Sequence, residues 1–421
     1  MSFCIHVPRF LRQNRMLGRI NAFEERYDLH DLCFLILLSA FPFFQIFKHS
    51  TMWLLPICAA MLLLLCASVT QKETIKVDFF DFLILLILLS QVSTAFTGYG
   101  RAVDALTAAF LTSIWFSARR FWGGEENQTR FAFLSSVALL IVSAIGVGQY
   151  LFGLAELRWV DASRFGDIGG RVTSLFSNPN ILAVYLLLYF PLSLHAIFSL
   201  QNTWRMRLFY ATTTVFCALC ILLTWSRGAW LGLALEVVLF LLLHSKRSRK
   251  MLCLLPLMLF AIPLLPSNFR GRLYSIADLG ESSIRYRLLT WQGTWKMLIC
   301  HPFGIGVGER AWRAVFPHFA VSGTARVMHA HNIFLQVAAE LGVVGLLVFL
   351  LLICKAIFCG VQQKNTAAVL AVAGALVMGL FDHLWYAPAM LVPFWAMSAL
   401  CARSEQKVTK KTPFVDILHE K

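Results

Sequence analysis

The segment RYRLLTWQGTWKMLICHPFGIGVGE (Arg285–Glu309) and the HAHN that follows it (His329–Asn332) decide how the chain is organised. Both lie within Arg270–Asn332, the longest stretch that is too polar for a bilayer, and apolar segments precede and follow it. We therefore expect membrane helices that hold one large loop. In this loop, guanidinium and imidazole groups gather at a membrane surface, which suits chemistry on an anionic lipid headgroup.

The composition outside this loop predicts a membrane fold. Mean hydropathy is +0.70, and 58% of residues are hydrophobic against 14% charged, whereas soluble domains carry roughly 25% charged residues. Backbone groups inside lipid must form their hydrogen bonds within the protein. We therefore predict an all-α, polytopic helical bundle of about 12 transmembrane helices with a large helical extracytoplasmic loop. The start of the chain is polar and basic and does not have the pattern of a cleavable signal peptide.

The hydropathy pattern divides the chain into five parts and one smaller outer loop. These are a basic amphipathic tail at 1–30, helices 1–9 within 31–265 with an outer loop at 152–179, a catalytic loop at 266–332, helices 10–12 within 333–402, and a tail at 403–421. Both tails are expected on the cytoplasmic side and the large loop outside.

The net charge of +15 does not require a nucleic-acid partner. In the predicted topology, 23 of the 37 Lys and Arg residues lie inside, which is the bias that orients membrane proteins. The other 14 lie outside, and 12 of them are arginine. This external excess runs against the rule and needs another cause.

Two arginines in the large loop differ in their predicted orientation. In a helix over Ser282–Ile299, the spacing of the apolar residues predicts a buried stripe. Its members are Ile284, Leu288, Trp291, Trp295 and Leu298. Arg287 lies at the edge of this stripe and should point into the protein, as a substrate ligand or in a structural salt bridge. Arg285 should face solvent or lipid headgroups.

Arg227 occupies a tight outer turn between two predicted spans, at the start of a helix. A helix N-terminus favours anions, and a guanidinium binds phosphate oxygens in pairs and stays charged. We predict that Arg227 binds phosphate; a side chain that merely reaches for the membrane boundary is the alternative. A second helix start is predicted in SNPN, with Asn178 as its N-cap and Pro179 as its first residue.

His331 lies just before an apolar helix, and only Asn332 stands between them. A helix N-terminus favours the neutral imidazole, which can accept a proton. We predict that His331 is a general base, with capping or packing as the alternative, and we regard His329 and Asn332 as secondary candidates. No histidine or carboxylate near them has the sequence spacing of a metal site, so we predict no metal.

Two acidic positions remain. Glu340 lies inside a span, nine residues beyond His331 and therefore on the opposite helix face. We expect that Glu340 ties helices together rather than takes part in catalysis, although intramembrane carboxylates are often functional. Asp382 and His383 lie at the outer end of the eleventh span, where they would border the same cavity as His331.

Four motifs, in this order, are similar to those of the O-antigen ligase and O-antigen polymerase superfamily of membrane glycosyltransferases. They are SNPNILAVYL (Ser177–Leu186), LTWSRGAWLGL (Leu223–Leu233), RLLTWQGTWKMLICHPFGIGVG (Arg287–Gly308) and HAHNIFLQVAAELGVVGLL (His329–Leu347). The resemblance covers roughly residues 170–395 and extends to the layout of spans around a large outer loop.

The resemblance implies an enzyme of the bacterial inner membrane with no cofactor. In the ligase branch, a glycan linked to undecaprenyl pyrophosphate is transferred to a sugar hydroxyl of lipid A–core on the outer face, without a metal. By matching position, Arg227 and Arg287 resemble the pyrophosphate-binding arginines of the family, and His331 resembles its candidate base.

We therefore expect a metal-independent, inverting GT-C-type glycosyl transfer to a hydroxyl acceptor on lipid A–core. A polysaccharide polymerase, or a protein O-oligosaccharyltransferase, is the nearest alternative, and a solute or bicarbonate transporter is a distant one. The expected partners are the lipid-linked glycan donor, the acceptor and membrane lipid. The reaction requires that Arg227, Arg287 and His331 converge on one external cavity that opens sideways to lipid.

Overall fold

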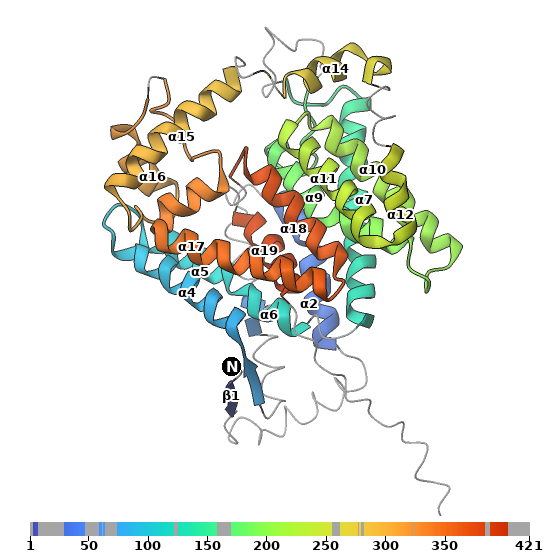
Figure 1. The fold of residues 1–421 in the computed structure, drawn as a ribbon, viewed down its shortest axis with the longest axis horizontal. Coiled ribbons are helices and arrows are strands. Elements are labelled where there is room, and N and C mark those ends of the chain that lie inside the picture. Colours follow the sequence, from blue (N-terminus) through green and yellow to red (C-terminus); the bar gives the residue numbers. More distant parts are fainter. Residues whose placement is uncertain are drawn as a thin grey trace, which may run out of the picture.

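The computed structural model describes most of the chain (Figure 1). The described residues are 3–6, 29–46, 59–60, 62–63, 74–121, 125–157, 170–254, 262–276, 278, 282–321, 323–383 and 388–402. Nearly all of the two predicted tails, most of the predicted second span (about 52–69) and the middle of the predicted ninth span (about 251–265) lie outside these residues. The division into parts therefore stays a prediction.

Six described helical segments are long and apolar enough to cross a membrane. They are α4 (Phe79–Ser93) with the short η3 (Thr94–Phe96), α7 (Glu125–Leu151), α9 (Pro179–Ile197), α10 (Trp204–Leu223), α11 (Arg227–His244) and α17 (Ile333–Gln362). Two shorter apolar helices, α18 (Thr366–Gly379) and α19 (Pro388–Cys401), follow. This arrangement confirms a helical, multi-pass protein, whereas the number of about 12 spans stays a prediction.

Some predicted spans are interrupted. The expected first span consists of α2 (Leu29–Ser39) and η2 (Phe41–Ile46), and the fourth consists of α5 (Ala102–Thr112) and α6 (Ile114–Phe121). One departure from an all-α fold is a two-stranded antiparallel sheet of β1 (Phe3–His6) and β2 (Thr74–Val77). The remaining elements are α12 (Lys246–Lys250), η6 (Met251–Leu254), η7 (Ile262–Leu264), α14 (Ser267–Tyr274), α15 (Ser282–Cys300), α16 (Glu309–Val315) and η8 (Phe316–His318).

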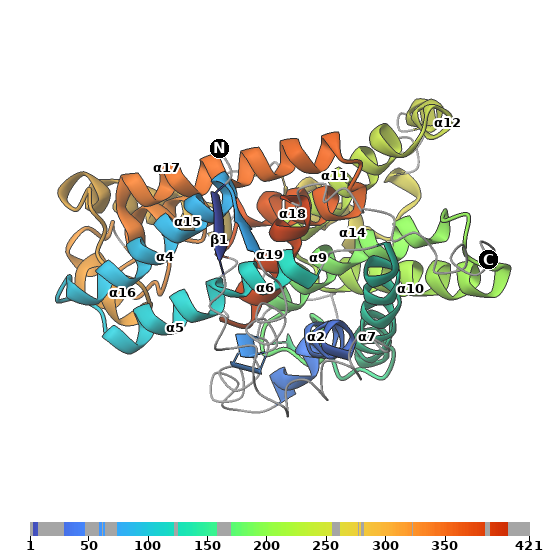
Figure 2. The same ribbon diagram turned by 90° about the horizontal axis from the view of Figure 1, so that it is seen from below.

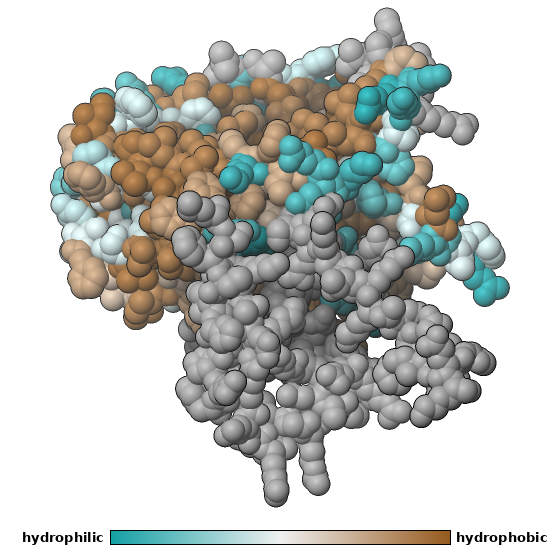
Figure 3. Space-filling view, turned by 60° about the horizontal axis from the view of Figure 1, so that its bottom comes forward, coloured by the Kyte–Doolittle hydropathy of each residue, from teal (hydrophilic) through white to brown (hydrophobic). Residues whose placement is uncertain are grey.

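The apolar helices pack into one bundle with α18 near its centre. Helix α18 contacts α11, α9, α17 and α19, while α10 packs on α7 and α9, and α17 packs along α4 (Figures 1 and 2). Large apolar side chains on the outer faces recur every three or four residues. On α17, Val344, Leu347 and Leu351 are exposed in this way. Figure 3 shows broad apolar surface with polar groups gathered at its edges, as expected for contact with lipid.

A break in α17 fastens the large loop to the bundle. Gly342 has φ +75° and interrupts the helix, so backbone groups on either side lose their helical partners. The segment after α15 supplies new ones: the Ile305 amide donates to the Ala339 carbonyl at 2.8 Å, and the Val343 amide donates to the Pro302 carbonyl at 2.9 Å. The PFGIGVG motif is thus a backbone clamp on α17.

Glu340 reinforces this clamp, as its predicted tying role requires. Its Oε1 accepts the Gly308 amide at 3.3 Å and the Gln336 side-chain amide at 2.9 Å. The other end of the Gln336 side chain accepts the Ala330 amide at 2.8 Å. Glu340 therefore links the loop after α15 to the turn that carries His329 and His331.

The predicted buried stripe of α15 is wrong in part. Leu288 and Trp295 are exposed by 44% and 59%, whereas Thr290, Thr294 and Met297 are fully buried. Gly293 explains this difference, because a Cβ there would lie 3.0 Å from the Phe319 carbonyl oxygen, so the helix approaches its neighbours on its small-residue face. The apolar side of α15 that was expected in the core therefore does not pack there as a whole.

Gly342→Ala tests the clamp. A Cβ at this position would lie 2.6 Å from the Phe303 carbonyl carbon, and the alanine would have to adopt a positive φ. Such backbone strain alone costs about 1–3 kcal/mol, and the close contact adds to it. We therefore expect the free energy of unfolding to fall by about 3 kcal/mol or more, with a lower thermal unfolding midpoint in detergent. Gly271→Ala is the control, since nothing lies within 4 Å of its added Cβ. Equal midpoints for the two variants would contradict the clamp.

Candidate active site

Arg227 is the first residue of α11 and is only 9% exposed. The turn before it is strained, because Trp225 adopts φ +53°, which is rare for a residue with a side chain. Its guanidinium donates to the Ser275 carbonyl at 2.7 Å and to the Ser283 hydroxyl oxygen at 3.0 Å. The tight turn predicted from the sequence therefore directs this arginine under the large loop rather than toward lipid headgroups.

Arg287 reaches the same point from α15. It donates to the Ser283 hydroxyl oxygen at 2.7 Å and to the Phe381 carbonyl at 2.8 Å. Two guanidiniums from separate helices thus meet at one hydroxyl oxygen, which is a neutral acceptor. As the helical spacing predicts, Arg287 points inward and Arg285 is exposed.

Two further arginines, which sequence reasoning did not select, complete a cavity of about 230 Å³. Arg171 donates to the Thr224 carbonyl at 2.7 Å, and Arg272 donates to the Trp225 carbonyl at 2.9 Å. Burial and the nearby guanidiniums lower the pKa of Arg171 to about 9, so it is still charged at neutral pH. We call this the arginine cavity; its four arginines are Arg171, Arg227, Arg272 and Arg287.

The arginine cavity also has an apolar wall. Ile284, Leu288 and Trp291 of α15 line it, so the apolar side of this helix faces a cavity instead of the core. A cavity with clustered guanidiniums beside apolar side chains fits an amphiphile with an anionic headgroup.

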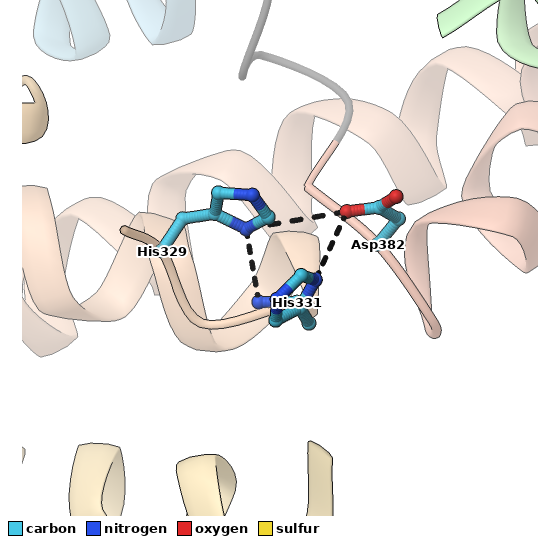
Figure 4. A group of neighbouring side chains, drawn as sticks. All are labelled: His329, His331 and Asp382. Atoms are coloured by element: carbon cyan, nitrogen blue, oxygen red, sulfur yellow. Dashed lines mark hydrogen bonds and ion pairs between the residues drawn. The ribbon is translucent and has the colours of Figure 1, made fainter. Parts of the chain in front are cut away.

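His331 lies opposite Asp382, with His329 beside both (Figure 4). The His331 Nδ1 and Asp382 Oδ1 atoms are 3.3 Å apart. Because an ionised carboxylate only accepts hydrogen bonds, this contact places a proton on Nδ1 of His331. The neutral ring then has its lone pair on Nε2, the atom that can take a proton from a substrate. His331 also adopts φ +50°, a strained backbone of the kind found at functional sites.

His329 is held in its neutral form. Its Nδ1 accepts the His331 backbone amide at 3.3 Å, and the residue is 7% exposed. Burial, His331 and Arg287 lower the pKa of His329 to about 4, against the opposing effect of Asp382. This histidine therefore supports the turn and carries no charge at neutral pH.

Asn332 fixes the position of both histidines. Its side-chain oxygen accepts the Phe334 and Leu335 amides at 2.9 and 3.0 Å, which caps α17. Its side-chain amide donates to the Leu380 carbonyl at 3.1 Å. The cap thus joins the histidine turn to the segment that carries Asp382.

Asp382 is the central residue that the predicted site did not include. Burial alone would raise its pKa, but the hydrogen bond from His331 and the positive charges around it hold the pKa well below the usual range. Its Oδ2 accepts the Asn180 side-chain amide at 2.7 Å. The signal in the sequence was the acid–histidine pair after an apolar helix, which lies 51 residues from His331.

The three predicted residues do not line one cavity, which corrects the sequence-based expectation. His331 and His329 line a second cavity of about 260 Å³, the histidine cavity, next to the arginine cavity. Asn180 and Asp382 line both. The reason is steric: these two side chains are hydrogen-bonded to each other, and they form a wall between the guanidiniums and the imidazoles. Glu340 and Asn332 line neither cavity.

The histidine cavity presents three groups that could hold a metal ion. One ring nitrogen each from His329 and His331 and a carboxylate oxygen of Asp382 lie within 4.8 Å of one another. Spacing along the chain does not reveal this cluster, because Asp382 lies 51 residues from His331. A metal at His329 Nδ1 would have to displace the His331 amide, which already occupies that lone pair.

One family model matches the middle of the chain. Residues 212–350 match the family model described as O-antigen ligase, which confirms the resemblance to that superfamily. The match includes Arg227, Arg287 and His331, and it indicates a membrane function of the ligase or polymerase type, with a glycosyltransferase-like activity. No curated protein matches the chain.

The protonation of His329 gives a testable pH dependence. The pKa of His329 is about 4 in the folded protein and has its ordinary value of 6.5 in the unfolded chain. Between these two values the unfolded chain binds a proton that the folded chain excludes. Stability should therefore fall as the pH drops through this window, by about 2 kcal/mol at pH 5 from this residue. His329→Gln, which keeps an acceptor, should lose less thermal stability between pH 7 and 5. The exposed His318→Gln is the control. If the wild type, His329→Gln and His318→Gln lose the same thermal stability between pH 7 and 5, a buried, neutral His329 is contradicted.

Proposed function

We propose that this protein is a glycosyltransferase that moves a glycan from undecaprenyl pyrophosphate to a hydroxyl of lipid A–core, on the outer face of the inner membrane. The observation that carries the proposal is the adjacency of the two cavities, which share Asn180 and Asp382. The proposal therefore no longer requires the single shared cavity that was expected from the sequence. A cluster of four arginines with an apolar wall suits a lipid diphosphate, and a carboxylate-oriented histidine suits a hydroxyl acceptor.

The arginine cavity would bind the donor diphosphate. As the bond between the anomeric carbon and the phosphate oxygen breaks, negative charge grows on the diphosphate. Fixed cations stabilise this charge more strongly in the transition state than in the ground state, which is how they accelerate the reaction. Arg227 and Arg287 already lie on one acceptor, Ser283, so phosphate oxygens can replace that hydroxyl with little movement.

The histidine cavity would bind the acceptor. Nε2 of His331 takes the hydroxyl proton as the acceptor oxygen attacks the anomeric carbon from the face opposite the diphosphate, which gives inversion. Asp382 keeps the imidazole in the required tautomer and stabilises the imidazolium that forms, as the carboxylate does in other acid–histidine pairs.

Single substitutions test these roles. Arg227→Ala, Arg287→Ala and His331→Ala should each lower kcat by about 10²–10³-fold or more, since each removes a group that acts in the transition state. The measurement is transfer of a pyrophosphate-linked glycan to lipid A–core by purified protein. Arg285→Ala is the matched control, because Arg285 lies on the same helix but is exposed. Wild-type rates in all three variants would rule out the mechanism.

A metal-assisted reaction is the second candidate, because His329, His331 and Asp382 could ligate an ion. We propose the metal-independent route, since the His329 lone pair is already used within the protein. Full activity in excess chelator is expected. Loss of activity with chelator and its recovery on adding a divalent cation would favour the metal.

The acceptor distinguishes the related functions. A polysaccharide polymerase would extend a lipid-linked glycan, and a protein O-oligosaccharyltransferase would modify a peptide hydroxyl. We expect transfer to lipid A–core to be faster than to either of the other two. Uptake of a solute or bicarbonate into vesicles, without any transfer, would instead support the transporter alternative.

A further inference from the structure

Asn180 stands between the two cavities and contacts the charged groups of both. It is the second residue of α9, which starts at SNPN as predicted: Asn178 caps the helix by accepting the Asn180 amide at 2.8 Å, and Pro179 is its first residue. The Asn180 side chain accepts Arg171 at 2.8 Å and donates to Asp382 at 2.7 Å. The motif therefore delivers one amide to the wall between the arginine and histidine cavities.

The chemistry of its neighbours fixes the orientation of this amide. A guanidinium has only donors, so the carbonyl oxygen of Asn180 must face Arg171. A carboxylate has only acceptors, so its NH₂ group must face Asp382. Among short side chains, only asparagine offers a donor and an acceptor on separate atoms without a charge. Aspartate would place two carboxylates together, and serine would supply a single oxygen for both neighbours.

The neutral amide also keeps two opposite charges apart. Arg171 and Asp382 are both partly buried, and without a spacer their attraction would favour a direct ion pair. That pair would draw the carboxylate away from His331 and would use a cation of the arginine cavity. With Asn180 in place, Asp382 stays directed at His331 and the charge of Arg171 stays available to an anion.

We infer that Asn180 is a positioning residue, which holds Asp382 against His331 and separates it from the arginine cluster. This inference rests on the proposed function. It predicts that Asn180 acts on the proton-transfer step more than on donor binding. Its NH₂ group holds the one carboxylate that orients His331, whereas its oxygen contacts only one of the four arginines of the arginine cavity.

The test compares Asn180→Asp and Asn180→Ala with the wild type in the transfer assay over a range of pH. Both should lower kcat by about 10–100-fold with a smaller change in KM for the donor. Asn180→Asp has nearly the shape of asparagine but adds a carboxylate. It should move the acid limb of the kcat profile to higher pH by about one unit or more, since the added charge favours the imidazolium. Among the described residues, the charged or titratable groups that act on Asp382 or line the histidine cavity with it are His329, His331, His383, Tyr286, Arg326, Arg171 and Arg287.

Asn178→Ala separates positioning from helix stability. It removes the cap of the same helix but keeps the Asn180 side chain. Because Asn178 also lines the histidine cavity, its rate can change, and the pH profile is the quantity compared. We expect a lower thermal midpoint and an acid limb at the wild-type pH. If Asn180→Asp does not fold, Asn180→Ser, which keeps one hydrogen-bonding atom, should give a kcat between those of Asn180→Ala and the wild type.

The outcomes distinguish the inference from the function. Wild-type kcat and pH profile in the Asn180 variants, with His331→Ala and Arg227→Ala inactive, would overturn the inference alone. The same shift of the acid limb in Asn178→Ala would also overturn it, because a loosened helix would then explain the effect. Full activity in His331→Ala and Arg227→Ala would instead refute the proposed function.

Discussion

The geometry of both cavities depends on one partly buried carboxylate, that of Asp382. Among the described residues that line either cavity, Asp382 is the only acid, and five arginines and three histidines line the cavities with it. A carboxylate taken out of water stays ionised only where hydrogen bonds and cations replace its hydration. Asp382 has both, so it can orient His331. In the proposed function, the four guanidiniums of the arginine cavity bind the anionic diphosphate.

Backbone carbonyls help to orient three of these arginines. Arg171, Arg272 and Arg287 each donate to a backbone carbonyl, of Thr224, Trp225 and Phe381 respectively. A carbonyl oxygen accepts a hydrogen bond from a guanidinium and so fixes its direction. The carbonyls belong to the strained turn before α11 and to the end of α18. The cap at Asn332 joins the histidine turn to the end of α18, and the break in α17 fastens the segment after α15. The backbone geometry of several helix ends therefore sets the site.

The sequence could predict what depends on local pattern. Apolar length gives the long helices, Asn178 and Asn332 give helix starts, and helical spacing separates Arg287 from Arg285. It could not predict what depends on packing between distant segments. The α15 stripe was assigned to the core because periodicity shows that a face is apolar but not what covers it. Arg171 and Asp382 act through contacts that cross tens of residues, and no spacing along the chain distinguishes Asp382 from a residue that merely ends a span.

The most direct test of the central claim separates binding of the donor from its chemistry. Purified protein in excess chelator is mixed with an undecaprenyl-pyrophosphate glycan, and both bound donor and a single turnover to lipid A–core are measured. The account predicts that His331→Ala binds the donor as the wild type does but transfers nothing, and that Arg227→Ala combined with Arg287→Ala binds little donor. Undiminished donor binding in the double arginine variant, or turnover at the wild-type rate in His331→Ala, would contradict it.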